Sequence, residues 1–371
     1  MTELDTSRPA RAGEEIDGEK LFARIGGELG RVLGFPIEGP FTIEQFPSGH
    51  SNLTYLLRVR GQNGASHELV LRRPPFGNVV KTAHDMAREN RILTALASPR
   101  AAYGKAPRPL LYVEDEDVLG TPFYVMTRLS GVILRRKPPT GVSLDSATIT
   151  RLSNAAVDGL IEIHSLPWEE IGLGTYGKPE GYAERQVKGW TKRYTDAKTD
   201  DVPDMERAAR WLKGNLPARD NERALATVIH NDFKYDNVVL DPSELTRIVG
   251  VLDWEMATIG DPITDLATTL AYWIEDGDAD PLKAFAFGPT HLPGSLKRRE
   301  IAELYAKRSG RDLASLPYFY AFALFKNAVV AQQIYKRYKL GLTKDERFAM
   351  MIMGVHLLAA AAVKCIDEGA I

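Results

Sequence analysis

Three side chains that carry oxygen atoms lie in two strand-like stretches near the middle of the chain. The first stretch, His230–Leu240, contains Asp232 and Asn237, and the second, Ile248–Glu255, contains Asp253. The segment between them begins Asp-Pro-Ser-Glu, a composition typical of turns. We therefore expect a β-hairpin that brings Asn237 and Asp253 close together at one edge.

These residue types suit phosphoryl transfer. Mg²⁺ prefers hard oxygen ligands and uses one or two protein side chains besides phosphate oxygens, a role open to Asn237 and Asp253. Asp232 could orient a hydroxyl group and accept its proton. Taken singly, the three residues could instead cap turns or a helix. Their combination with two strand-like stretches favours the phosphoryl-transfer site.

Length and composition limit the alternatives. A chain of 371 residues exceeds the size of most single hydrophobic cores, so we expect two lobes. A net charge of -2 offers no broad basic face, and we expect no nucleic-acid partner. The single cysteine, Cys365, excludes an intrachain disulfide framework and indicates an inert core thiol. It fits a reducing compartment, and we expect a cytoplasmic protein of undetermined oligomeric state.

The ends of the chain show no export or membrane signal. The first twenty residues alternate charges without an apolar run and indicate a flexible tail. The most apolar stretch, residues 348–363, is interrupted by Gly354 and His356. It falls short of the roughly 20 residues that a bilayer span needs, so we expect a buried helix and no membrane partner.

The order of elements predicts an α+β fold. The first part should contain three strands, a helix and two strands, and helical periodicity dominates after Gly131. The expected strands lie within residues 41–43, 53–59, 68–71, 109–113 and 123–126, and the expected helices at 82–96, 149–163, 207–216, 264–273, 321–338 and 348–363.

The two stretches His230–Leu240 and Ile248–Glu255 resemble the aminoglycoside phosphotransferase family of protein-kinase-like small-molecule kinases. Within that family, the resemblance is to the branch fused to, or encoded beside, acyl-CoA dehydrogenases. The resemblance covers almost everything from about Phe35 to the C-terminus. The residues that carry it, besides the two stretches, are Gly260-Asp261-Pro262, Asp265-Leu266-Ala267, Ile171-Gly172-Leu173, Tyr182, Arg185-Gln186-Val187, Trp190, Tyr194, Tyr320–Lys326 and Ile334-Tyr335.

The resemblance implies a protein-kinase-like two-lobe fold with an antiparallel-sheet N-lobe and a mostly helical C-lobe. Residues 1–34 would form an N-terminal tail and leading helix, residues 35–128 the nucleotide-binding N-lobe, and residues 129–371 the C-lobe with the catalytic and metal-binding loops and the acceptor site. It also implies ATP as phosphoryl donor and Mg²⁺ as cofactor.

Three roles follow for the residues of the two stretches. The resemblance makes Asp232 the catalytic base and Asn237 and Asp253 the Mg²⁺ ligands. His230 would support the loop. The family usually has Gly between this His and Asp, whereas this chain has Asn231, a residue that tolerates a left-handed backbone.

The first lobe offers candidates for nucleotide binding. Gly49, Ser51 and Asn52 would correspond to the phosphate-covering loop, although an ordinary turn fits too. Where kinase-like folds have a strand lysine paired with a helix glutamate, this chain offers Arg72 or Arg73 with Glu89 as partner; we favour Arg72. A surface ion pair is the alternative.

Other candidates concern adenine and the acceptor. Backbone groups of Met126 and Thr127 would meet adenine at an interlobe hinge, which could also be a plain linker. Arg185, Gln186 and Trp190 could line the acceptor pocket or equally anchor their helix.

Three further residues have structural interpretations. His164 is expected to be a packing histidine, and Asp261 and Asp265 are expected to cap and brace the helix that follows the metal loop.

The function predicted is an ATP-dependent kinase for a hydroxylated small molecule, such as a hydroxyacyl compound. Motifs of P-loop enzymes, serine hydrolases and zinc proteases are absent from the sequence. A nucleotide-binding pseudokinase stays open because of the missing lysine and Asn231. Metal-assisted hydrolysis by Asp232, Asp236 and Asp253 is a weaker alternative.

Overall fold

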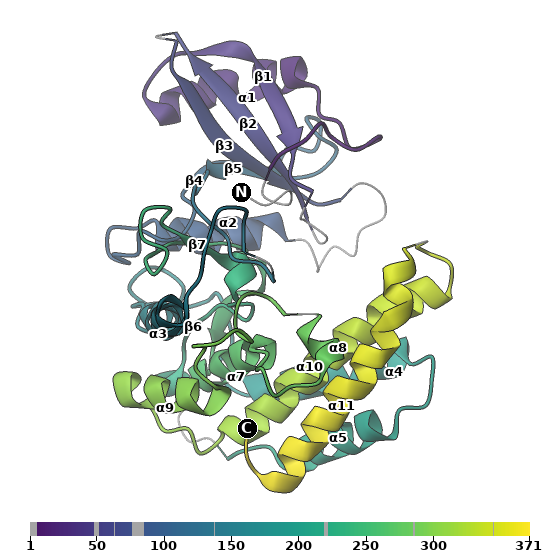
Figure 1. Cartoon of the computed structure of the whole chain (residues 1–371). Coiled ribbons are helices and arrows are strands. Elements are labelled where there is room, and N and C mark those ends of the chain that lie inside the picture. Colours follow the sequence, from purple (N-terminus) through teal and green to yellow (C-terminus); the bar gives the residue numbers. More distant parts are fainter. Residues whose placement is uncertain are drawn as a thin grey trace.

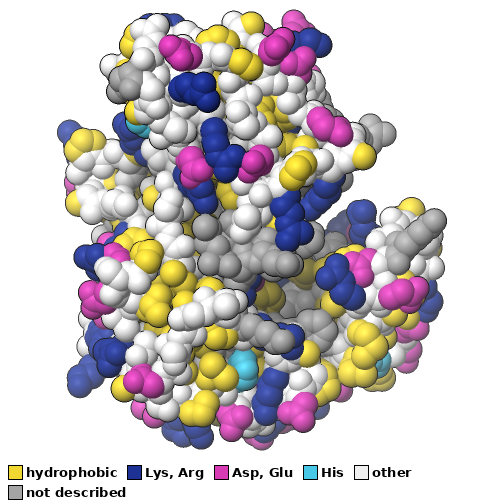
Figure 2. All heavy atoms as spheres, turned by 45° about the horizontal axis from the view of Figure 1, so that its top comes forward, with side chains coloured by type: hydrophobic (Ala, Val, Ile, Leu, Met, Phe, Trp, Pro, Cys, Tyr) yellow, Lys and Arg dark blue, Asp and Glu magenta, His cyan; other side chains and the backbone are white. Residues whose placement is uncertain are grey.

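The chain forms two lobes, a twisted sheet with two helices and a larger helical body (Figure 1). This computed structural model describes residues 6–47, 52–62, 64–75, 85–136, 138–218, 222–284, 286–343 and 345–371. On the face shown in Figure 2, acidic and basic side chains are interspersed, and the surface is hollowed between the lobes. The predicted α+β two-lobe fold is confirmed.

The first lobe contains one antiparallel sheet with strand order β1-β2-β3-β5-β4. The predicted sequence of three strands, a helix and two strands is present, and a further helix precedes it. Its elements are α1 (Gly18–Leu33), β1 (Ile37–Gln45), β2 (Leu53–Gly61), β3 (Ser66–Arg73), α2 (Met86–Leu96), β4 (Pro109–Val113) and β5 (Phe123–Thr127).

The alternation of side chains along β3 decides which arginine enters the space between the lobes. Leu69 and Leu71 belong to the core under α1, whereas Val70 belongs to the core that continues into the helical lobe. Because strand side chains alternate between faces, Arg72 lies on the same face as Val70, toward α2, and Arg73 on the other.

The N-terminal segment differs from the expected flexible tail. In its described part, Arg8 and Gln45 exchange two backbone hydrogen bonds of 2.9 and 2.7 Å, and Tyr55 Oη donates to Glu14 O at 2.7 Å. The reason is that β1 is an edge strand whose outer backbone groups need partners.

The second lobe is built around the long helix α10, which contacts α7, α4, α5 and α11 (Figure 1). Its helices are α3 (Ser146–His164), α4 (Tyr182–Ala197), α5 (Pro203–Gly214), α6 (Glu222–Leu225), α7 (Pro262–Tyr272), α8 (Asp280–Lys283), α9 (Arg298–Ser309), α10 (Leu316–Lys339) and α11 (Met351–Glu368), with 3-10 turns η1 (Tyr235–Asn237), η2 (Trp254–Met256) and η3 (Glu346–Met350). Its strands are β6 (Thr227–Ile229), β7 (Val238–Leu240), β8 (Ile248–Val251) and β9 (Thr258–Gly260).

The last helix is longer and less buried than expected. Residues 346–368 form a helical segment of 23 residues that is long and apolar enough to cross a membrane, and 33% of its most apolar window is buried. One such helix is weak evidence for a span, because core helices pass the same test. Cys365 on this helix is buried, as predicted, and burial raises its pKa to about 11. The cytoplasmic location stays a prediction.

The hairpin of β7 and β8 is attached to the chain that joins the lobes. β7 and β8 pair antiparallel, which confirms the predicted hairpin. Val132, just after the first lobe, donates to Leu240 O at 2.9 Å and accepts from Leu240 N at 2.8 Å. Gly131 makes this approach feasible, since a Cβ there would lie 2.4 Å from Leu240 O.

We predict that Gly131→Ala lowers the free energy of unfolding by about 2 kcal/mol, because the added methyl group overpacks the junction between the lobes. Gly189→Ala in α4 is the matched control, since its Cβ would meet nothing within 4 Å. Helix propensity should make the control as stable as the wild type or up to about 1 kcal/mol more stable. Urea denaturation measures both, and equal effects of the two changes would contradict the interpretation.

Candidate active site

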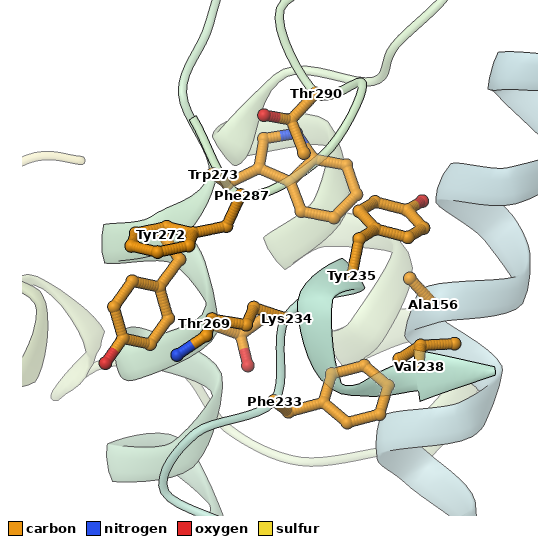
Figure 3. Close-up of a pocket in the computed structure, with 10 residues that line it drawn as sticks. All are labelled: Ala156, Phe233, Lys234, Tyr235, Val238, Thr269, Tyr272, Trp273, Phe287 and Thr290. Carbon is orange, nitrogen blue, oxygen red and sulfur yellow. The ribbon is translucent and has the colours of Figure 1, made fainter. Parts of the chain in front are cut away.

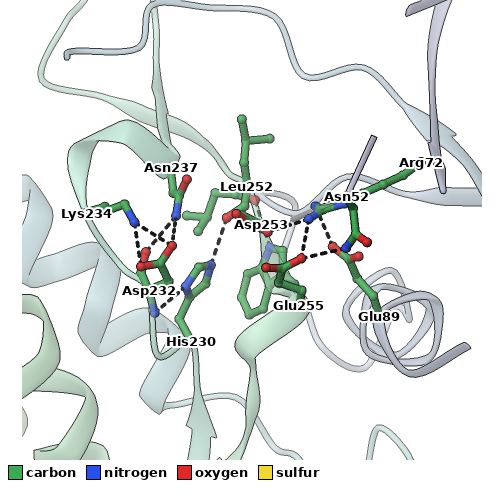
Figure 4. Close-up of polar contacts among 12 residues, drawn as sticks. Asn52, Arg72, Glu89, His230, Asp232, Lys234, Asn237, Leu252, Asp253 and Glu255 are labelled. Atoms are coloured by element: carbon green, nitrogen blue, oxygen red, sulfur yellow. Dashed lines mark hydrogen bonds and ion pairs between the residues drawn. The ribbon is translucent and has the colours of Figure 1, made fainter. Parts of the chain in front are cut away.

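Two adjoining loops bring the three predicted oxygen-bearing side chains together (Figure 4). Asp232 lies on the loop after β6, Asn237 ends η1 just before β7, and Asp253 follows β8. Leu252 N donates to Asn237 O at 2.8 Å and joins the two loops. Residues far apart in the sequence therefore meet at one edge of the hairpin, as expected.

The Asp232 carboxylate is held by two donors. Lys234 Nζ lies 2.7 and 2.8 Å from its two oxygens, and Asn237 Nδ2 donates to Oδ2 at 2.8 Å. The carboxylate stays 16% exposed, so a substrate can reach it. The sequence analysis missed Lys234, although a lysine two positions after the carboxylate was a readable signal.

His230 links the same two loops. Its Nδ1 lies 3.3 Å from the backbone N–H of Asp232 and accepts that hydrogen bond, so the proton on Nε2 is donated to Leu252 O at 3.0 Å. The ring packs against Trp254 with 4.7 Å between centroids. Burial lowers the pKa of His230, which keeps the imidazole neutral in this role.

Two residues of the site have a left-handed backbone. Asn231 has φ of 63° and Asp253 has φ of 65°. Asn231 takes the conformation expected of it and secures it by donating from Nδ2 to Met256 O at 3.0 Å. Asp and Asn tolerate this region better than most residues, and such backbone strain concentrates at functional sites.

Asp265 holds the backbone of the Asp232 loop. It accepts from His230 N at 2.6 Å and from Asn231 N at 2.7 Å, and its side chain is fully buried. His164 Nε2 lies 3.1 Å from the same carboxylate, while Tyr305 Oη lies 2.7 Å from Nδ1. His164 is thus the packing histidine that was predicted.

Asp261 and Asp265 were expected to cap and brace the helix after the metal loop, and the two residues divide these roles. Asp261 is the cap, accepting from Ile263 N at 2.9 Å, whereas Asp265 points across to the loop. Burial would raise the pKa of Asp265, but the hydrogen bond and charge of His164 and those of His230 lower it below its ordinary value. The carboxylate is therefore ionised where it holds the loop.

A buried ionic cluster joins the lobes. Arg72 donates at 2.8 Å to each of three carboxylates, those of Glu89 on α2, Asp253 and Glu255. Asn52 at the start of β2 donates to Glu255 at 2.7 Å. One guanidinium thus faces three carboxylates, and the sequence analysis missed Glu255.

The donor set fits Mg²⁺. The Asn237 amide nitrogen is engaged by Asp232, which turns its carbonyl oxygen away from that carboxylate (Figure 4). Burial opposes the charge of Asp253, but Arg72 outweighs it and lowers the pKa, so the carboxylate is ionised. Two hard oxygens on adjoining loops match what Mg²⁺ takes from protein. Within the described ranges, no three His, Cys, Asp or Glu side chains form a complete protein cage.

Comparison with known proteins identifies the family. The model of the phosphotransferase enzyme family matches residues 42–301, more than half of the chain. The chain belongs to this family.

Curated relatives are longer proteins. Acyl-CoA dehydrogenase family member 11 of Pongo abelii is 35% identical over 335 residues, which cover 90% of this chain and 41% of that protein. The probable acyl-CoA dehydrogenase IBR3 of Arabidopsis thaliana is 32% identical over 341 residues, 89% of this chain and 40% of its own length. The chain thus spans about two fifths of these relatives, which confirms the predicted branch.

Solved structures show the same fold. The crystal structure of a protein from Ralstonia eutropha, titled as an aminoglycoside phosphotransferase, has a TM-score of 0.75 and 26% identity, and covers 95% of this chain and 99% of that one. Choline kinase from Cryptosporidium parvum has a TM-score of 0.58 and 14% identity, with 89% and 91% covered, and supports the fold alone.

The structure describes some of the predicted nucleotide-binding residues but not all of them. Gly49 and Ser51 lie outside the described residues. Asn52 is buried and donates to Glu255 of the ionic cluster. Thr127 N already donates to Arg108 O at 2.9 Å, so a hinge contact with adenine would have to use other backbone groups of Met126 and Thr127.

The predicted choice of Arg72 over Arg73 agrees with the contacts. Arg72 makes the ion pair with Glu89, whereas Arg73 Nε donates to Pro74 O at 3.0 Å on the other face of the strand. The guanidinium of Arg72 is 10% exposed, so its ion pairs differ from the exposed surface pair that was the alternative.

The predicted acceptor residues on α4 differ in their contacts. Arg185 is exposed and donates to the backbone oxygens of Lys178 and Glu180, which anchors the start of its helix. Gln186 is half-buried, and Trp190 is 7% exposed. Their role in acceptor binding stays a prediction.

A small aromatic pocket adjoins Lys234 (Figure 3). The ammonium lies 4.7 Å from the ring centroid of Tyr272 and 4.9 Å from that of Phe287, and Trp273 and Tyr235 are among the other residues that line the pocket. Arg185, Gln186 and Trp190 do not line it. The walls of this pocket come from separate segments of the chain, so no local sequence pattern indicates it.

We predict that Asp265→Asn lowers the free energy of unfolding by about 3 kcal/mol and slows phosphotransfer, since the amide oxygen can satisfy only one of the two backbone donors and the carboxylate that His164 contacts is lost. Asp261→Asn is the control, because Asn caps helices as well as Asp does. Urea denaturation and initial rates measure both. A stable Asp265→Asn variant would refute the role of the carboxylate.

A pH effect follows from the ionic cluster. Burial and then the charge of Asp253 raise the pKa of Glu255 to about 7, against an ordinary value near 4.5. The folded protein therefore binds a proton that the unfolded chain releases, and the stability of the unliganded protein should fall as pH rises from about 4.5 to about 7.

The stability of Glu255→Gln should not fall with pH in this way, because Gln does not titrate. We therefore expect the stability of this variant relative to the wild type to improve between pH 5 and pH 8. Denaturation at several pH values tests this. Glu244→Gln on the exposed turn is the control and should keep the wild-type profile. A stability difference between Glu255→Gln and wild type that does not change with pH would contradict the assignment.

Proposed function

We propose that this phosphotransferase moves the γ-phosphoryl group of ATP to a hydroxyl group of a small molecule and requires Mg²⁺. The observation that supports it most is the meeting of Asp232, Asn237 and Asp253 on adjoining loops, with Arg72 of the first lobe bonded to Asp253. In this arrangement the proposed base, the two proposed metal ligands and a cation would lie beside one another. The family and its structural neighbours support small-molecule phosphotransfer.

Asp232 would act as the base. The acceptor oxygen forms a bond to the γ-phosphorus, the bond from that phosphorus to the bridging oxygen breaks, and ADP leaves with the bridging oxygen. The hydroxyl proton passes to the Asp232 carboxylate. Lys234, which binds both carboxylate oxygens in the free enzyme, is close enough to exchange one of them for the transferred group and stabilise its charge.

Asn237 and Asp253 would hold Mg²⁺, which when bound neutralises charge on the phosphates. Arg72 would replace the lysine of kinase-like strands. Its planar guanidinium has five donors, so it can keep Glu89 while offering N–H groups to a phosphate.

The acceptor is proposed to be a hydroxyacyl compound. The support is association with relatives named as acyl-CoA dehydrogenases, of which this chain spans about two fifths. A screen of hydroxyacyl thioesters, other hydroxylated metabolites and aminoglycosides for magnesium-dependent ATP consumption tests it. Consumption that needs a hydroxyacyl thioester supports the proposal, and consumption only with aminoglycosides overturns this acceptor class.

A pseudokinase is the second candidate, favoured by the arginine in place of lysine and by Asn231. Two observations weigh against it: Arg72 makes the expected ion pair with Glu89, and Asn231 takes the left-handed backbone that the loop needs. Nucleotide binding without phosphate transfer to any acceptor would decide for it. Asp236, required by the hydrolase alternative, pairs with Arg135 at 3.4 Å.

We predict that Asp232→Asn lowers kcat by several orders of magnitude, because the base is lost, while the affinity for nucleotide stays within about threefold of wild type. Asp241→Asn is the matched control on the turn of the same hairpin, where Asp241 pairs with exposed Arg247. It should keep wild-type rates. Steady-state kinetics and nucleotide titration measure both, and near-normal turnover of Asp232→Asn would refute the base.

A further inference from the structure

Lys326 is a buried cation that the proposed reaction has not used. It lies in the middle of α10 and is 8% exposed. Its ammonium has one hydrogen bond among the described residues, to Asn231 O at 3.5 Å, the longest distance that still counts as such a bond. An ammonium has three donors, so at least two N–H groups have no protein acceptor within the described part of the chain.

The burial of this charge is not offset by an ion pair. No carboxylate in the described ranges lies within ion-pair distance of Lys326. Burial lowers the pKa of Lys326, and the more distant charges of Asp232 and Asp265 oppose that effect. If Lys326 served only for packing, an apolar residue of similar length would make the protein more stable, because one long hydrogen bond and a cation-π contact at 5.8 Å offset little of the cost of burying a charge.

The position of Lys326 relates it to the reacting groups. The carbonyl that it contacts belongs to Asn231, the residue immediately before Asp232. The ammonium also lies 5.8 Å from the ring centroid of Trp190 on α4, and Arg193 lies 4.5 Å from the same ring. Lys234 is bonded to Asp232 itself. Arg193 on α4 and Lys326 on α10 therefore both carry positive charge on this side of Asp232.

We propose that Lys326 and Trp190 form a subsite that binds a carbonyl or carboxylate oxygen of the acceptor, so that the enzyme selects hydroxyl compounds bearing such an oxygen and disfavours polycations. This inference rests on the proposed function and deepens it. The free N–H groups of Lys326 supply the hydrogen bonds, and the indole of Trp190 covers the adjacent carbon chain. A polycationic acceptor would meet Lys326, Lys234 and Arg193 as like charges.

The test compares two acceptors of equal chain length, a hydroxyacyl thioester and an alcohol in which a methylene group replaces the carbonyl. Equilibrium binding is measured by calorimetry with the full chain, nucleotide and Mg²⁺. The wild type should bind the thioester about 10- to 100-fold more tightly than the alcohol, the size expected of a hydrogen bond to a charged donor. Lys326→Met should bind the two equally, and Lys326→Arg should restore part of the preference.

Three further readouts separate recognition from a structural role. In Lys326→Met the KM for nucleotide should change by less than twofold, and the melting temperature should equal or exceed that of wild type, because an unpaired buried charge is removed. The free hydroxy acid, as a third ligand, distinguishes a carboxylate from a thioester carbonyl as the oxygen that is bound. Its preference over the alcohol should also depend on Lys326.

The inference is overturned if the wild type shows no preference for the oxygen-bearing ligand, or if Lys326→Met keeps that preference. It is also overturned if Lys326→Met unfolds at lower temperature and loses both ligands alike, since Lys326 would then only support the fold. Phosphate transfer is scored separately. Binding with the predicted preference but no transfer would refute the kinase and leave the subsite supported.

Discussion

One guanidinium between three carboxylates is the interaction on which the arrangement of the two lobes depends. Arg72 reaches from β3 to Glu89 on α2 and across to Asp253 and Glu255 beside the catalytic hairpin. The cluster is largely buried, and the carboxylates exceed the cation in number. Burial raises the pKa of Glu89 and that of Glu255, the latter to about 7, so a divalent cation bound here would favour the ionised form of these carboxyl groups.

A second constraint is the backbone of the Asp232 loop. Two residues of the site, Asn231 and Asp253, have positive φ, and the loop keeps that geometry because Asp265 binds two consecutive N–H groups. The ionised carboxylate is itself held by His164 and lies on the buried helix α7. The position of Asp232 therefore depends on α7, whose Asp265 holds the backbone of the loop and whose Tyr272 lines the pocket beside Lys234.

The charge around Asp232 bears on the proposed acceptor. Lys234 lies on the Asp232 loop itself, Lys326 contacts that loop from α10, and aromatic side chains line the pocket beside Lys234. The overall charge of -2 gives no indication of these two lysines near Asp232. Family membership defines the reaction class, while this distribution of charge bears on which hydroxyl compound is used. The curated relatives carry additional sequence beyond the part that matches this chain.

The sequence by itself determined the family, the order of strands and helices, the hairpin and the three oxygen-bearing residues, because each depends on local pattern or on motifs of fixed spacing. The left-handed Asn231 was likewise predictable from its residue type. Only the tertiary structure decided that the N-terminal segment pairs with β1, that Asp265 holds the catalytic loop, and that Glu255 and Lys326 lie beside the site. These depend on contacts between segments 31 to more than 200 residues apart, such as Asn52 with Glu255. Such contacts cannot be predicted from local sequence. They form only when packing brings distant charges and unpaired backbone groups into the same desolvated space.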